Sequence, residues 1–168
     1  CAQRIFDVRT HTKDIKGPQI VFCDLSTPKV RFEDYEYGKD FDAYNDLKYK
    51  LVRMGIPQEE IAYIHEANTD EQKQALFDKV NSGAVRVLLG STEKCGAGTN
   101  VQKRLVALHH LDTPYRPSDM EQREGRIIRQ GNTNENVKIF TYVTERTFDS
   151  YSYQILENKQ RFIAQINR

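Results

Sequence analysis

The stretch Ser118-Asp-Met-Glu-Gln-Arg-Glu-Gly-Arg-Ile-Ile-Arg-Gln-Gly131 places Gln122, Arg126 and Arg129 four and three residues apart. Residues at these spacings are neighbours on a helix surface, so the three side chains should share one face. Two permanently charged guanidinium groups side by side repel each other, and a phosphate or a pair of carboxylates is a common reason for such a pair. The stretch also fits a solvated helix face on which neighbouring glutamates balance the charge, and by itself it leaves both interpretations open.

The composition indicates one ordinary domain. A chain of 168 residues can bury roughly two thirds of its unfolded surface, which is enough for a real core. Its 25 basic and 24 acidic residues nearly cancel, so any nucleic-acid contact must come from a local patch. The three cysteines lie far apart without paired spacing, which fits a reducing compartment and predicts no metal site. His109 and His110 lack a cysteine or carboxylate partner nearby and fit core or edge histidines better than a metal pair.

Neither a membrane span nor a secretory leader is visible in the sequence. No apolar run approaches the roughly 20 residues of a spanning helix, and the first residues lack an apolar leader segment. We therefore expect a cytoplasmic protein without a membrane partner. Because the chain begins with Cys1 and not with Met, we also expect it to be a piece of a longer protein.

Apolar segments and turn formers alternate along the chain in a way that predicts an α/β fold. We expect strands over residues 19–24, 61–65, 85–89, 104–111 and 137–143. We expect helices over 41–54, from a cap at Thr69 or Asp70 to a stop at Asn81-Ser-Gly83, around Gln122 and from about 147 onward. In the second of these helices we expect the inward-facing residues to be Ala75, Leu76, Phe77 and Val80. This order predicts a mainly parallel sheet with helices on both faces, in a domain over residues 19–168. Residues 1–18 are predicted to form an N-terminal helix or irregular arm, and residues 26–40 a loop insertion.

Small and polar residues follow the third predicted strand, in Gly90-Ser-Thr-Glu-Lys-Cys-Gly-Ala-Gly-Thr-Asn100. Glycines let a backbone approach a phosphate closely, and the hydroxyls of Ser91 and Thr92 can donate to it, although the stretch also fits a flexible loop. The carboxyl ends of parallel strands lie at one edge of the sheet, where ligands bind. We therefore expect this loop, the Gln122 helix and the polar strand end Asp24-Leu-Ser26 to meet at that edge.

The sequence has neither a Gly-x-x-x-x-Gly-Lys-Ser/Thr loop nor a strand that ends in a paired acidic box for magnesium. A domain with paired arginines but without these elements cannot by itself bind and hydrolyse a nucleoside triphosphate well. We expect it to complete the site of another domain, because an arginine supplied across a cleft stabilises the charge on a transferred phosphoryl group.

Several ordered motifs together resemble the superfamily 2 helicases and translocases, most of all the Swi/Snf-like branch. The segment from Gln122 to Gly131 resembles motif VI of that family. Residues 19–24 resemble motif IV, residues 91–100 resemble motif V, and residues 112–117 resemble the segment that precedes motif VI. The resemblance covers roughly residues 19–165 and implies the second, C-terminal lobe: a three-layer RecA-like lobe of the P-loop NTPase type.

The resemblance implies a role for each matching residue. Arg129 would be the arginine finger, Arg126 its partner at the γ-phosphate, and Gln122 the residue that organises the motif. Gly98 and Asn100 would lie near the nucleotide and the interface between the lobes. The residues implied at the surface that tracks the nucleic acid are Asp24, Ser26, Ser91, Thr92, Lys94, Cys95 and Gly96.

The chain departs from the Swi/Snf-like pattern at a few positions. Lys94 and Cys95 stand where that branch usually has Ala and Gly, Arg123 replaces a small residue, and Glu66 replaces a Gly. The wording of the motifs around Gly90–Asn100 and Arg116–Arg126 is most similar to the helicase parts of large phage and conjugative-element proteins that also carry a DNA methyltransferase domain.

This resemblance implies the C-terminal motor lobe of an ATP-dependent DNA helicase or translocase from a bacterium or a mobile element. ATP, with its Mg²⁺, would be held mainly by a missing N-terminal RecA-like lobe, so the isolated chain should bind no cofactor and be inactive. Its partners would be that lobe, DNA and possibly an attached DNA methyltransferase domain. Two alternatives are a non-catalytic nucleic-acid or protein binding module that kept the fold, and a free-standing phosphate-binding α/β protein.

Overall fold

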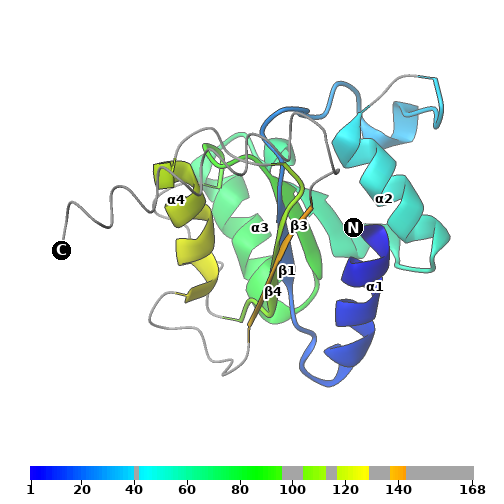
Figure 1. Ribbon diagram of the computed structural model, residues 1–168. Coiled ribbons are helices and arrows are strands. Elements are labelled where there is room, and N and C mark those ends of the chain that lie inside the picture. Colours follow the sequence, from blue (N-terminus) through cyan, green and yellow to red (C-terminus); the bar gives the residue numbers. More distant parts are fainter. Residues whose placement is uncertain (40–41, 96–103, 113–116, 129–136, 143–168) are drawn as a thin grey trace.

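A computed structural model describes residues 1–39, 42–95, 104–112, 117–128 and 137–142. Its centre is a sheet of five strands in the order β2-β3-β1-β4-β5, and all neighbouring strands are parallel (Figure 1). The strands are β1 Gln19–Phe22, β2 Ile61–Tyr63, β3 Val87–Gly90, β4 Ala107–His110 and β5 Lys138–Thr141. The predicted α/β architecture with a parallel sheet is therefore confirmed.

Helices cover both faces of this sheet. The α-helices are α1 Ala2–His11, α2 Ala43–Arg53, α3 Asp70–Ser82 and α4 Pro117–Ile128, and short 3-10 turns are Lys13–Ile15, Phe32–Asp34, Gln58–Glu60 and Ile64–Glu66. Figure 1 shows α1 and α2 on one side of the strands, with α3 and α4 on the other. Along β1, Val21 packs in the cluster that contains α1 and α2, whereas Ile20 and Phe22 pack in the cluster that contains α3. Successive residues of a strand point to opposite faces, so a strand buried on both sides reads as a continuous apolar run.

Helix α3 has clear start and stop signals. The Thr69 hydroxyl accepts a hydrogen bond from the Gln72 amide, and the Gln72 side chain accepts one from the Thr69 amide, which completes a capping box. The helix ends at Gly83, whose φ of 87° is in the left-handed region that favours glycine. Phe77 and Val80 face inward as expected, but Ala75 is exposed, so that part of the prediction is wrong. Residue 75 lies two positions before Phe77, a spacing that puts it on another side of the helix.

The predicted second strand is shorter than expected. It ends at Tyr63, and Ile64–Glu66 turns as a 3-10 segment that closes with a hydrogen bond from the Ala67 amide to the Ile64 carbonyl. The buried Ile64 side chain therefore packs against the sheet from a turn and not from a strand.

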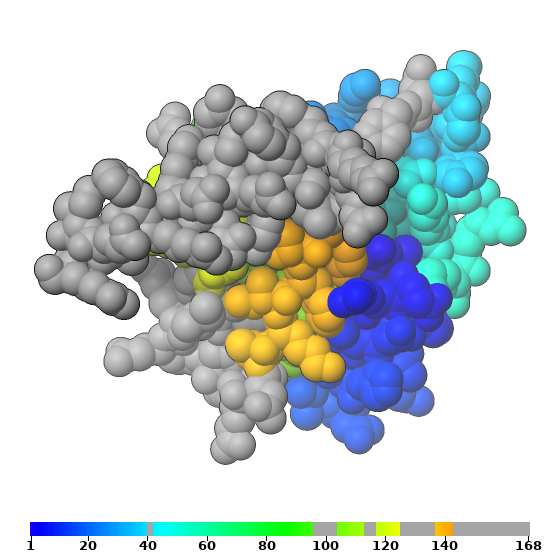
Figure 2. Space-filling model, in the orientation of Figure 1, coloured from blue at the N-terminus to red at the C-terminus, as the bar shows by residue number. Residues whose placement is uncertain are grey.

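The N-terminal segment is a helix that packs on the sheet and not an irregular arm. Ile5 in α1 is fully buried, and its carbonyl accepts a hydrogen bond from Gln19 Nε2 at the start of β1. Arg9 forms two 3.0 Å bonds to the Glu60 carboxylate. Figure 2 shows α1 beside the side chains of β5 on the surface, where the Arg4 guanidinium lies 5.1 Å from the centre of the Phe140 ring.

A buried arginine ties this segment to the amino ends of the strands. Arg86 directly precedes β3 and is 5% exposed. Its Nε donates to the Gly17 carbonyl at 3.1 Å, and its Nη2 donates to the Arg9 carbonyl at 2.9 Å and to the Thr12 hydroxyl at 3.1 Å. We call Arg9, Thr12, Gly17 and Arg86 the Arg86 cluster. This cluster holds the segment that leads into β1, and the acceptors that bind the Arg86 guanidinium are all neutral.

The two strand histidines are fully buried in β4, as predicted for core histidines. His109 lies between Gln19 Oε1 at 2.7 Å and the Tyr142 hydroxyl at 2.8 Å. Burial, with nearby positive charge, lowers the pKa of His109 to about 3, so this imidazole is neutral. Within the described residues there is no group of three side chains that could hold a metal ion, and no helix long and apolar enough to cross a membrane.

Candidate functional site at the carboxyl ends of the strands

The register of the sheet brings three polar residues to one place. Phe22, at the end of β1, pairs with Gly90 of β3 on one side and with His110 of β4 on the other. The residues two positions beyond these are Asp24, Thr92 and Asp112. Because paired residues of parallel strands lie side by side, these three residues converge at the carboxyl edge. This is the edge at which ligands bind in open α/β sheets.

Arg123 of helix α4 joins these strand ends. The residue is 0% exposed. Its Nη2 lies 2.7 Å from Asp24 Oδ2 and 2.8 Å from Asp112 Oδ1, its Nε donates to the Thr92 hydroxyl at 2.7 Å, and its Nη1 donates to the Asp112 carbonyl at 2.8 Å. A buried guanidinium is tolerated when its charge is paired and its donors are satisfied, and both conditions hold here.

The environment of Arg123 is completed by two rings. Its Nη1 lies 3.3 Å from His110 Nδ1, and its guanidinium lies 5.2 Å from the centre of the Phe22 ring. Arginine can only donate, so Nδ1 of His110 accepts and its Nε2–H is left to donate to Glu124 Oε1 at 3.3 Å. We call Asp24, Thr92, His110, Asp112 and Arg123 the Arg123 cluster.

The two carboxylates of the cluster also bind the backbone of the turns. Asp24 accepts from the Thr92 amide and from the Thr92 hydroxyl, each at 2.7 Å. Burial alone would raise the pKa of Asp24, but these two bonds and the Arg123 guanidinium outweigh it and hold that pKa below the usual 3.8. Asp112 Oδ2 accepts from the amides of Asp24 and Leu25 at 2.6 and 2.7 Å. Each carboxylate therefore fixes the turn that follows a neighbouring strand.

The turn after β3 holds most of the residues predicted to contact nucleic acid. Ser91 and Thr92 are buried, and the Ser91 hydroxyl accepts from the Lys94 amide at 3.1 Å. The Lys94 side chain is exposed at the tip of the turn. Cys95 is 1% exposed, and its Sγ lies only 2.3 Å from the point that a Cβ on Gly90 would occupy. Its thiol is therefore core packing, and a contact from Cys95 to a nucleic acid would have to come from its backbone.

The structure brings only some of the other predicted site residues together. Asp24 and Thr92 are in direct contact, whereas the Ser26 hydroxyl accepts a hydrogen bond from the Ala43 amide at the start of α2. Gln122 is exposed on α4, and the backbone of Arg126 lies one turn further along the same helix, which confirms a helix over this stretch. The predicted site residues outside the described part of the chain are Gly96, Gly98, Asn100 and Arg129.

The sequence motifs do not single out Arg123 or Asp112 as site residues. Arg123 was visible only as a bulky residue in place of a small one. A usable signal was present, because Arg123 is three residues after Met120 and four before Ile127, at helical spacing with two apolar residues. A charged residue on the buried side of a helix needs a partner, and the polar ends of β1 and β4 provide it.

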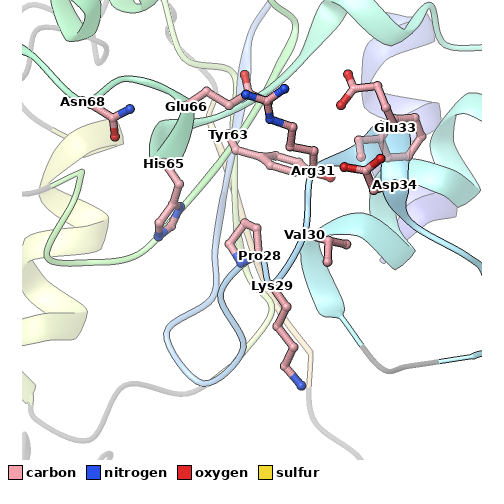
Figure 3. Close-up of a pocket in the computed structure, with 11 residues that line it drawn as sticks. Pro28, Lys29, Val30, Arg31, Glu33, Asp34, Tyr63, His65, Glu66 and Asn68 are labelled. Carbon is pink, nitrogen blue, oxygen red and sulfur yellow. The ribbon is translucent and has the colours of Figure 1, made fainter.

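A separate pocket of about 640 Å³ opens beyond the end of β2 (Figure 3). Figure 3 shows Glu33 and Asp34 on one side of this pocket and His65 and Asn68 on the other. The loop over residues 28–34 forms one wall and is held by a bond from Asn45 Nδ2 to the Val30 carbonyl. Basic and acidic side chains both line this pocket, so it has no clear preference for an anion. The Arg123 cluster is the better-defined site.

Comparisons with known proteins agree with this geometry. The family of the helicase conserved C-terminal domain matches residues 12–131. The defense against restriction protein B of Escherichia phage P1 is 32% identical over 76 residues, which are 45% of this chain and 3% of that protein.

Two solved structures share the fold. The C-terminal part of the Fun30 ATPase domain has a TM-score of 0.66 at 18% identity, over 92% of this chain and 43% of that one. A DEAD box protein from the hyperthermophile Methanococcus jannaschii has a TM-score of 0.58 at 15% identity, over 95% of this chain and 37% of that one. The chain thus spans less than half the length of each of these proteins. With a family match over most of its length, the chain belongs to the family of the helicase conserved C-terminal domain.

Proposed function

We propose that this chain is the C-terminal motor lobe of an ATP-dependent DNA helicase or translocase of the Swi/Snf-like branch. The observation that carries the proposal is the convergence at one edge of the register-matched ends of β1, β3 and β4 with helix α4. This helix carries both Gln122 and Arg126. The nucleic-acid-facing turn and the nucleotide-facing helix would thereby meet around one cluster.

The residues of this chain fit one part of an ATP site. Gln122 is exposed on α4, and Arg126 and Arg129 follow it at the spacing of one helix face. ATP, held with Mg²⁺ mainly by an N-terminal lobe, supplies the phosphoryl group that is transferred to water. Arg126 and Arg129 stabilise the negative charge that develops on this group, and Gln122 orients the helix at the nucleotide. By the resemblance, Gly98 and Asn100 would lie near the nucleotide and the interface between the lobes.

The track is proposed to be the phosphate backbone of DNA. Lys94 is exposed at the tip of the turn after β3, and its ammonium group can pair with a phosphate. The amides of Thr92, Lys94 and Cys95 already donate within this edge and hold the turn in place. Thr92 and Asp24 support this turn from below, and Ser26 lies on the next turn of the same edge. Cycles of closing and opening between two lobes would move these contacts along the DNA.

We propose that the chain is part of a longer polypeptide that contains the N-terminal lobe and acts in the cytoplasm of a bacterium, encoded by the host or by a mobile element. The three matched proteins described above are each more than twice as long as this chain, and one of them belongs to a phage. The phage match covers too little of that protein to bear on an attached DNA methyltransferase domain, which remains a prediction from the resemblance.

Replacing the predicted arginine finger in the longer protein tests this function. Arg129→Ala should lower DNA-stimulated ATP turnover by about 10³-fold or more, because it removes charge stabilisation in the transition state. Arg53→Ala is the matched control, because Arg53 lies on helix α2, away from α4, where its Nη1 donates to the Tyr49 hydroxyl at 3.0 Å. Turnover measured with and without duplex DNA gives the comparison.

Two results would contradict the proposal. Wild-type turnover in the Arg129→Ala protein would show that Arg129 is not an arginine finger. Tight ATP binding by residues 1–168 alone would show that the chain holds a complete site. A longer protein that binds DNA but hydrolyses no ATP would favour the non-catalytic binding module.

A further inference from the structure

The Arg123 cluster connects two regions that the proposed function keeps separate. The turn Ser91–Cys95 faces the nucleic acid, and helix α4 faces the nucleotide. Arg123 lies between them and bonds both to Thr92 in that turn and to Asp24 at the end of β1. Any displacement of the turn therefore acts on the guanidinium through bonds of 2.7 Å.

We propose that Arg123 is a positioning residue that fixes helix α4 to the ends of β1, β3 and β4, so that the nucleic-acid-facing turn and the arginine-bearing helix move together. This inference rests on the proposed function for its consequence in catalysis. Its structural part concerns only the described residues of this chain.

The geometry of the cluster requires arginine and not merely a positive charge. The planar guanidinium donates from Nε, Nη1 and Nη2 at once, to a hydroxyl, a carbonyl and two carboxylates. A lysine offers one ammonium group at the end of a flexible stem and cannot reach acceptors on three different strand ends in one plane. Arg123→Lys therefore keeps the charge but loses the connection among the three strands.

Asp24 is the member of the cluster that can respond to a ligand. Its side chain is 33% exposed, whereas Asp112 is nearly covered at 7%. The Asp24 carboxylate holds both polar groups of Thr92, its amide and its hydroxyl. A phosphate that approaches the turn meets the exposed side of this carboxylate, and the resulting movement is passed to Arg123.

The chain contains a matched control at the opposite edge of the sheet. Arg86 is also buried and also joins segments far apart in sequence, and its guanidinium bonds three oxygen atoms where that of Arg123 bonds four. Its partners belong to the N-terminal segment and not to the proposed site. Arg86→Lys thus makes the same chemical change at a similar degree of burial, away from both ligands.

The first test measures ATP turnover in the longer protein, at a temperature well below the unfolding of each variant. Arg123→Lys should lower the DNA-stimulated kcat by about 10- to 100-fold, the size of effect expected when catalytic groups are misplaced by about 1 Å. The KM for ATP and the affinity for DNA should change less than about threefold, since Arg123 touches neither ligand. Arg86→Lys should retain kcat within about twofold. A wild-type kcat in Arg123→Lys overturns the inference.

The second test measures amide hydrogen exchange in residues 1–168 and does not depend on ATP hydrolysis. Arg123→Lys should speed exchange in α4 and at the amides of Asp24, Leu25 and Thr92, while α1 stays as in the wild type. Arg86→Lys should speed exchange in α1 and leave exchange in α4 as in the wild type. Unchanged exchange in α4 of the Arg123→Lys chain overturns the inference, whatever the turnover measurements give. If the wild-type longer protein hydrolyses no ATP, the proposed function fails and the exchange result still decides whether Arg123 positions α4.

A milder variant covers the case in which Arg123→Lys does not fold. Asp24→Asn weakens one ion pair at a partly exposed position and leaves Asp112 to pair with Arg123. It should speed exchange in α4 in the same direction but less. Wild-type exchange in this folded variant would also overturn the inference.

Discussion

The two edges of the sheet each carry a buried arginine, but the two arginines bind different kinds of acceptor. In the Arg86 cluster the acceptors are two backbone carbonyls and the Thr12 hydroxyl, all neutral. In the Arg123 cluster they include two carboxylates, a hydroxyl and a carbonyl. The Arg86 guanidinium thus binds neutral acceptors directly, with the Arg9–Glu60 ion pair near it, whereas the Arg123 guanidinium belongs to a network of opposite charges.

Because of this difference, we expect the Arg86 cluster to act as a structural anchor and the Arg123 cluster to respond to ligands. Neutral acceptors such as carbonyls fix the N-terminal segment and do not change with pH or with a bound anion. Carboxylates at strand ends are titratable, and an approaching phosphate repels them. The chain therefore concentrates its responsive charges at the edge where parallel α/β sheets bind ligands.

The largest difference between the edges is expected when each arginine loses its charge. Arg123→Met leaves the carboxylates of Asp24 and Asp112 without their partner, and breaking a buried pair in this way costs about 3–5 kcal/mol of unfolding free energy. Arg86→Met removes hydrogen bonds to neutral groups, and we expect a loss of about 1–3 kcal/mol. Urea denaturation of residues 1–168 measures both values. An equal or larger loss in Arg86→Met would show that the two edges do not differ in this way.

Within the Arg123 cluster, the two carboxylates should not be equivalent. Asp112→Asn affects a nearly buried group that binds Arg123 and two backbone amides, and we expect a loss of about 2–3 kcal/mol. Asp24→Asn affects a partly exposed group, and a loss of about 1 kcal/mol is expected after screening by solvent. The midpoints of thermal or urea unfolding give the order. A larger loss in Asp24→Asn than in Asp112→Asn would show that the partly exposed carboxylate contributes more to stability than the buried one.

Between the two edges, His109 should make stability depend on pH. Its pKa is about 3 in the folded chain against an ordinary 6.5, so between these values the unfolded chain binds a proton that the folded chain does not. Its contribution is complete above pH 6.5 and declines as the pH falls toward 3, by at most about 1.4 kcal/mol per pH unit. Asp24 has a pKa held below 3.8, so its contribution is complete above about pH 3.8 and is lost as the pH falls below that value.

The variant His109→Gln should flatten this slope, measured as unfolding free energy at pH values from 7 to 4.5. A shallower slope remains, because burial also lowers the pKa of His65. An unchanged slope in His109→Gln would show that another group dominates.

The smallest expected effect concerns DNA binding at the two edges. Lys94→Ala, at the carboxyl edge, should weaken binding of the longer protein to duplex DNA and lower the slope of log affinity against log salt by about 1, the loss of one phosphate contact. Lys13→Ala removes an exposed lysine near the amino edge and should leave that slope unchanged. Titrations at several salt concentrations measure both. Equal effects of the two variants on the salt dependence would mean that DNA does not bind preferentially at the carboxyl edge.

Much of the fold could be predicted from the sequence, because strands buried on both faces read as short apolar runs between turn formers. Thr69 and Gly83 marked the limits of α3 because caps and left-handed turns depend on local chemistry. The Arg123 cluster could not be predicted in this way. Asp24 and Asp112 are 88 residues apart in sequence, and only the pairing of β1 with β4 brings them together.

The predicted nucleic-acid surface shows the same limit. A glycine-rich loop indicates where a backbone can approach a phosphate, but it does not indicate which side chains turn inward. Thr92 is buried and bonds to Asp24. Cys95 is buried because its Sγ occupies the space that a side chain at Gly90 would fill. Lys94, between them in sequence, remains exposed.

The most direct test of the functional difference between the edges is hydrogen exchange in the longer protein, with and without a non-hydrolysable ATP analogue and duplex DNA. We predict slower exchange in segments 22–26, 90–95 and 117–128 when both ligands are bound, and no change in segments 12–19 and 83–87. Protection at the amino edge, or none at the carboxyl edge while both ligands are bound, would contradict this account.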